Sequence, residues 1–316
     1  MSAPLVEQIA NAVLYEGYLL YPYRSSAVKN RQRWNFGVVA PGESMETQCL
    51  ASGGPMATLS VKVRCLRLVE RVVGAPEPAA FIEVEGQRYE SWQEAAECEM
   101  SLPDLRLVEL EAAQVTQLFG HRATRSEERV GDSGVIVRTQ EPLDCLITAS
   151  AEQIQEGLYR IAIRIANTTP APALAPAQAL LSAHTILRVR GGEFVSLLDP
   201  PPEFQPAAAS CHNMGTWPVL AGEEGARDAL LSSPIILYDY PQVAPESPGD
   251  LFDGAEIDEI LSLRILTLTD EEKDAMRRSD ERARRILERT ESLPAEHFMK
   301  LHGALRNLRP AAKEAP

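Results

Sequence analysis

The sequence lacks any long hydrophobic run. No uninterrupted apolar stretch in its 316 residues reaches about 18 residues, the length at which a transmembrane helix becomes a candidate. The first twenty residues, MSAPLVEQIANAVLYEGYLL, have no basic segment and carry Glu7 and Glu16 among the apolar positions. This is a poor match to a secretory signal peptide. We therefore expect no membrane association and a cytoplasmic location.

Cysteine is scarce and shows no motif spacing. The chain has 5 cysteines, an odd number, and no Cys-x-x-Cys pair. That pattern gives no indication of a disulfide framework, a zinc ribbon or a thioredoxin-type site. Reduced thiols in a cytoplasmic protein are the expectation.

The familiar catalytic signatures are also missing. The sequence contains no Gly-x-Gly-x-x-Gly, no Walker loop, no Gly-x-Ser-x-Gly and no His-Glu-x-x-His. Nothing therefore indicates a common nucleotide site, a serine hydrolase or a zinc protease. Whether the protein is an enzyme stays open, and a protein without catalytic activity is favoured.

One basic region stands out in a chain with a net charge of -14. This charge opposes general binding to nucleic acid or to anionic membranes. Residues 17–42 nevertheless contain no acidic residue, and they carry Arg24, Lys29, Arg31 and Arg33 beside aromatic residues that include Trp34. Three interpretations remain: a solvated loop, docking onto the chain's own acidic segment, or a site for an anionic ligand or partner, which arginine forks suit.

The opposite charge dominates a later segment. No lysine or arginine occurs from Asp228 to Leu263. We predict an acidic surface there that includes Asp239, Glu246, Asp250 and Asp253. The spacing of these acids does not fit an EF-hand calcium site. Acidic residues near the start of a helix are also explained by their favourable interaction with the helix dipole. A second contact surface for a protein partner is the prediction.

Alternating apolar residues dominate the first two thirds of the chain. Residues 58–65 and 159–166 alternate with period two, which is typical of half-buried strands. Glu85-Gly86 and Gly191-Gly192 lie between such runs and predict hairpins. Residues 121–129 are polar and predict a loop. Many short strands joined by glycine and proline turns indicate an antiparallel sandwich or an open barrel.

The final third changes to a helical pattern. A capping box at Thr269–Glu272 and a proline at 294 predict helix starts. The predicted fold class is α+β, with an antiparallel β-rich body at 1–232 and an acidic, proline-containing connector at 233–253. A small helical region at 254–308 and a tail at 309–316 follow.

The stretch SCHNMGTWP at 210–218 groups the most reactive side chains. Cys211 and His212 suit either a soft transition metal or a nucleophile with its base, and His184 is a third candidate. Adjacent side chains on an extended chain point apart, and the other cysteines and histidines are scattered singly. A structural loop, with Trp217 as its anchor and Cys211 buried, is therefore favoured. No cofactor is identified beyond this candidate metal.

Two segments carry a resemblance to a known family. YPYR at 21–24 with RWNFG at 33–37, and the stretch from 233 to 272, resemble an uncharacterised bacterial family associated with nickel–iron hydrogenase gene clusters. The resemblance extends over most of the chain and carries no catalytic residues. It implies an accessory or maturation role, with a hydrogenase subunit or a maturation factor as partner.

The leading functional prediction is thus a non-enzymatic accessory, binding or assembly protein. One alternative is a metal- or thiol-dependent protein that uses the Cys-His loop. The other is a β domain that binds a small molecule in a cavity lined by aromatic residues.

Overall fold

Antiparallel strands make up most of the described protein. The computed structural model describes residues 2–14, 37–74, 77–132, 134–170 and 176–242, and scattered residues between 269 and 292. The α+β fold class with a β-rich body is confirmed. Most of the predicted connector and helical region lies outside the described residues. No helix among the described residues is long and apolar enough to cross a membrane.

The described elements are few helices and many strands. The helices are α1 (Ser2–Leu14), α2 (Leu107–Ala112) and α3 (Gln205–Ala209), with short 3-10 turns at Pro176–Gln178 and Pro202–Phe204. The strands are β1 (Ser44–Val73), β2 (Phe81–Val84), β3 (Gln87–Glu90), β4 (Trp92–Arg106), β5 (Val115–His121), β6 (Thr124–Val130), β7 (Gly134–Gln140), β8 (Leu143–Gln155), β9 (Leu158–Asn167), β10 (Leu181–Val195), β11 (Trp217–Leu220) and β12 (Ala229–Ser233).

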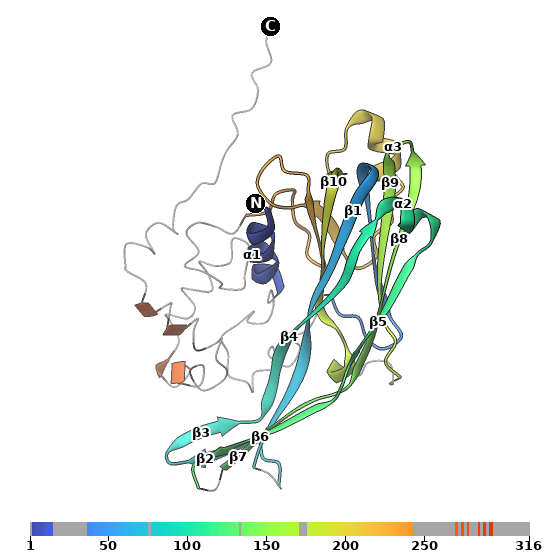
Figure 1. Cartoon of the computed structure of the whole chain (residues 1–316). Coiled ribbons are helices and arrows are strands. Elements are labelled where there is room, and N and C mark those ends of the chain that lie inside the picture. Colours follow the sequence, from blue (N-terminus) through green and yellow to red (C-terminus); the bar gives the residue numbers. More distant parts are fainter. Residues whose placement is uncertain are drawn as a thin grey trace.

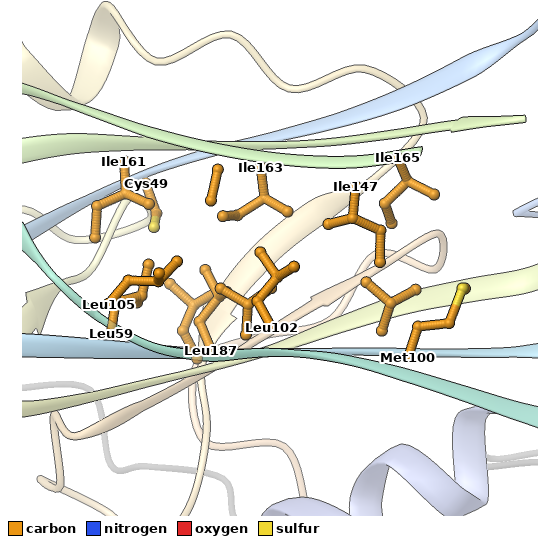
Figure 2. Packing of buried hydrophobic residues seen from close by; sticks show 14 of the residues in the cluster. Cys49, Leu59, Met100, Leu102, Leu105, Ile147, Ile161, Ile163, Ile165 and Leu187 are labelled. Carbon is orange, nitrogen blue, oxygen red and sulfur yellow. The ribbon is translucent and has the colours of Figure 1, made fainter. Parts of the chain in front are cut away.

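The main sheet folds over into two layers that share β1. In the first layer, residues 44–52 of β1 pair with β9, which continues to β8 and β5. In the second, residues 58–71 of β1 pair with β4, and β10, β12 and β11 extend that layer. Figure 2 shows Ile161 and Ile163 of the first layer facing Leu59, Leu102 and Leu187 of the second. Alternating apolar residues from both layers form one core.

Glycines lie where the paired strands β1 and β10 cross from one layer to the other. The pairing of these strands shifts register between Gly53 and Thr58. The hairpin predicted at Gly191-Gly192 is wrong, because β10 continues through both glycines as one strand. Gly191 has a φ of 71°, and a Cβ on Gly192 would lie 2.2 Å from the Ser52 carbonyl oxygen. The glycines therefore serve a bend and a close strand contact, not a turn.

Two further predictions have opposite outcomes. The β2–β3 hairpin is confirmed, with positive φ angles of 53° at Glu85 and 76° at Gly86. The loop predicted at 121–129 is wrong, because β6 pairs with β7 along its whole length. Both faces of β6 are largely exposed, so its sequence has no apolar alternation to indicate a strand.

The ends of β1 and β4 extend beyond the sandwich as an arm. β7 pairs with the last residues of β1, β6 pairs with β7, and the β2–β3 hairpin lies near the tip of the arm (Figure 1). Glu94 accepts hydrogen bonds from Arg71 at 3.2 Å and from Arg138 at 3.0 Å, and Arg138 also pairs with Glu128 at 2.7 Å. This ion-pair network links four strands where apolar burial is limited.

Helix α1 covers the outer face of the second layer. Val6 and Ile9 pack on Ile186 and Leu231. Beside this apolar contact, buried Arg64 of β1 donates hydrogen bonds to the side chains of α1 and β4, namely Asn11 and Glu97. These bonds fix the orientation of the helix on the sheet.

Replacing Gly192 with alanine should strongly destabilise the fold. The new Cβ has no room beside the Ser52 carbonyl, so the strand crossing must open. We expect Gly192→Ala to lower the free energy of unfolding by about 2 kcal/mol or more, measured by denaturant titration. Gly54→Ala is the matched control, because nothing lies within 4 Å of a Cβ there. Equal stability of the two variants would contradict the crossing geometry.

Candidate functional site

The Cys-His loop is fixed to the edge of the sheet beside β1. It follows α3 and runs along residues 44–48 of β1. The Gln48 amide donates to Asn213 Oδ1 at 2.8 Å, and the His212 amide donates to Gln48 Oε1 at 2.9 Å. Reciprocal backbone hydrogen bonds join Met214 and Glu46 at 2.8 and 3.1 Å. These bonds hold the loop along the edge of the sheet.

Within the loop, the Cys211 and His212 side chains point in different directions. Cys211 packs with Leu50, Leu158 and other apolar residues, whereas His212 is exposed. Burial raises the pKa of the Cys211 thiol, and Arg160 opposes this effect. The arrangement does not favour a nucleophile with its base. Trp217 is 44% exposed, so its expected anchoring role is wrong.

His184 lies in a different part of the sandwich from His212. Its ring is fully buried in the second layer, beside Arg64, and its Nδ1 lies 2.6 Å from the Ser182 carbonyl oxygen. Arg64 contacts α1 on the outer face of that layer, whereas Gln48, in the part of β1 that pairs with β9, holds the His212 amide. The structure therefore does not bring His184 and His212 together.

A shallow polar groove runs beside the loop. It has a volume of about 440 Å³ and is lined by Gln48, Ser150, Ala151, Glu152, Arg160, Ala162, Ser210 and His212. The Arg160 guanidinium donates to Glu152 and, at 2.8 Å, to Ser210 Oγ. The expected small-molecule cavity inside the body, lined by aromatic residues, differs from this groove in both position and lining.

The structure brings together a second group of reactive side chains that the sequence did not reveal. Cys65 of β1 lies directly opposite Cys98 of β4, and their thiols form a hydrogen bond. The Nε2 atom of His121, at the end of β5, lies 3.3 Å from Cys98 Sγ. Cys145 of β8 is close enough to influence both thiols. These residues are scattered singly along the sequence, and only the pairing of the strands brings them together.

The thiols in this group differ in their acidity. The hydrogen bond from Cys65 and the charge of Arg67 lower the pKa of Cys98 despite its burial. The hydrogen bond to Cys98 and burial raise the pKa of Cys65 well above its usual value. Burial and Arg67 lower the pKa of His121, so its ring is neutral near pH 7. Cys98 is therefore the member of the pair that ionises first.

Neither cysteine site forms a ready metal centre. Among the residues that the structure describes, no group of three or more histidine, cysteine, aspartate or glutamate side chains is arranged to hold a metal ion. All five cysteines are free thiols.

The charged surfaces predicted from sequence are largely outside the described residues. This applies to the basic residues Arg24, Lys29, Arg31 and Arg33, to Trp34, and to Glu246, Asp250 and Asp253. Asp239 is described, and it serves a structural contact: its carboxylate accepts hydrogen bonds from Ser196 Oγ and from the Leu220 amide, the latter at 2.8 Å. Asp239 therefore joins loop segments to β11.

Comparisons with known proteins add no assignment. The chain matches no protein-family model, and a search of curated proteins finds no significant similarity.

Removing the Asn213 side chain should release the Cys-His loop. Asn213→Ala removes the acceptor for the Gln48 amide, so the loop should open more often and expose Cys211. We expect at least a tenfold faster alkylation of Cys211, measured by mass spectrometry of the folded protein. His212→Ala is the control and should leave the rate unchanged. Equal rates in the two variants would show that Asn213 does not hold the loop.

Burial of His184 should make stability depend on pH. Burial lowers its folded pKa to about 4 from an ordinary value of 6.5, so the unfolded chain binds this proton first. Stability should therefore fall as the pH drops from about 7 to 5, and His184 should contribute about 2 kcal/mol of that loss. Denaturant titrations at both pH values measure the total. In His184→Gln the pH dependence should be smaller by that amount; an unchanged dependence would contradict the assignment.

Proposed function

We propose that this protein is a non-enzymatic accessory or assembly factor that binds a partner protein through an apolar surface around β11. We define this β11 surface by five exposed side chains: Leu198, Met214, Trp217, Ile236 and Tyr238. Their exposed fractions range from 44% at Trp217 to 86% at Tyr238. Contiguous exposed apolar surface marks a site of association, and the exposure of these five side chains on segments joined around β11 carries the proposal.

Hydrogen bonds bring the three segments of the β11 surface together. Trp217 pairs with Ser233 in the sheet, and the Ile235 amide donates to Ser233 Oγ at 3.1 Å. The Tyr240 amide donates to the Leu220 carbonyl at 2.8 Å. Asp239 links Ser196 to Leu220, which brings the segment after β10 to the same edge. The apolar side chains thus lie on segments that hydrogen bonds fix to the edge of the second layer.

The chemistry of the surface favours docking by side chains. Tryptophan and tyrosine are enriched among residues that dominate binding energy, because they bury a large area and lose little conformational entropy. Strand addition is disfavoured at β11, which is four residues long and contains Pro218, a residue without an amide donor. A partner with a matching apolar patch is therefore the expected occupant.

The resemblance supports a particular class of partner. A nickel–iron hydrogenase subunit or maturation factor is the candidate, and a cytoplasmic location with reduced thiols fits this proposal. In the sequence, the acidic segment follows Tyr240. We propose that this segment and the basic segment at 18–36 add charge complementarity, which speeds association and selects partners.

Binding to purified hydrogenase subunits and maturation factors tests the proposal. The double variant Trp217→Ala/Tyr238→Ala should weaken binding by at least tenfold, measured by biolayer interferometry, because each residue fits the character of an interface anchor. The control is Met56→Ala/Leu118→Ala, which removes exposed apolar side chains elsewhere on the molecule and should leave the affinity unchanged. Absence of binding by the unaltered protein would contradict the proposed class of partner. Equal binding by both double variants would contradict the proposed role of the β11 surface.

A further inference from the structure

We propose that Cys65 and Cys98 are a redox modification site: a peroxide oxidises Cys98, assisted by His121, and Cys65 then closes a reversible disulfide between β1 and β4. This site is separate from the Cys-His loop and from the β11 surface. Its function does not depend on the proposed partner.

The strand pairing meets the geometric requirement of a disulfide. Cys65 and Cys98 are direct partners in the antiparallel register of β1 and β4. Directly opposed residues in such a pair have Cα atoms about 4.5–5.5 Å apart, and disulfides span Cα distances of about 4.4–6.8 Å. Both side chains belong to the same core cluster. The bond can therefore form without separating the strands.

Cys98 is the member of the pair that an oxidant reaches. It is 8% exposed, whereas Cys65 is fully buried. Among the described strands, β4 pairs with β1 alone, so Cys98 lies on a strand with one free edge. A peroxide is small enough for such a site, and Cys65 is protected from direct attack.

His121 supplies the base for the first step. Its Nε2 lies 3.3 Å from Cys98 Sγ, within reach for a sulfur hydrogen bond. The charged neighbours of this pair are Arg67, Asp144 and Glu99. Arg67 favours both a neutral imidazole and a Cys98 thiolate, and Glu99 opposes the thiolate. A neutral imidazole can accept the Cys98 proton as the thiolate forms.

The chemistry balances with hydrogen peroxide as the oxidant. The Cys98 thiolate attacks one peroxide oxygen, the O–O bond breaks, and the hydroxide that leaves takes a proton to become water. This gives a sulfenic acid on Cys98. Cys65 then attacks that sulfur, the S–O bond breaks, and a second water leaves. Two thiols lose two electrons in total, and one peroxide gains them.

Closure of the bond would fasten the base of the arm. Cys65 is followed directly by the part of β1 that leaves the sandwich, and Cys98 ends the corresponding part of β4. A covalent link there prevents the two strands from separating where the arm begins. Oxidation should therefore make separation of β1 and β4 at the base of the arm less frequent.

Peptide mapping after peroxide treatment tests the proposal. The full-length, reduced protein is treated with equimolar hydrogen peroxide, alkylated and digested. We expect a peptide pair joined through Cys65 and Cys98, a mass lower by two hydrogens, and reversal by dithiothreitol. Cys65→Ala should stop at a sulfenic acid on Cys98 that dimedone traps. His121→Gln should slow disulfide formation at least tenfold, and Cys211→Ser should not change the rate.

Several results would overturn the proposal. A disulfide between Cys98 and Cys145, a link between two chains, or oxidation confined to Cys211 would each exclude this pair as the site. An unchanged rate in His121→Gln would remove the histidine's role. Stoichiometric zinc in the purified protein, lost on alkylation of Cys98, would identify a metal site instead. Mapping of the unaltered protein decides the main question even where a variant fails to fold.

Discussion

One strand, β1, connects the two layers of the sandwich and the arm. β1 runs from Ser44 to Val73, far longer than the usual five or six residues. Its first part completes one layer of the sandwich, its middle part completes the other, and its last part forms the arm. Where β1 passes from one layer to the other, Gly192 of β10 permits a close contact with the backbone of Ser52 and Gly53. Backbone sterics at this crossing constrain the whole architecture.

The candidate sites take their positions from β1. Gln48 holds the Cys-His loop, Arg64 joins α1 to the sheet, and Cys65 lies against Cys98. The side chains alternate along the strand, so these residues face different surroundings: solvent, a helix and the core. The β11 surface lies further away, at the edge of the second layer. The proposed redox site and the proposed partner-binding surface therefore occupy separate parts of one scaffold.

Structural features that depend on a local residue pattern could be predicted from the sequence. Features that depend on pairing between distant strands could not. The alternation at 159–166 identified β9 because one face is buried and the other is not. At Gly191-Gly192 the same residues suit a turn or a bend, and only pairing with β1 distinguishes them. β6 had no pattern because both its faces are exposed. The Cys65–Cys98 pair depends on the register of β1 and β4, which local sequence does not specify.

Native-state hydrogen exchange along β1 tests most directly whether this strand holds the layers together. Amides in residues 44–52 and 58–66 should exchange with the same free energy, equal to that of global unfolding, because neither layer can open while the other keeps the strand. Two segments whose free energies of exchange differ by more than about 1 kcal/mol would show that the layers unfold separately, and would contradict a fold built on one shared strand.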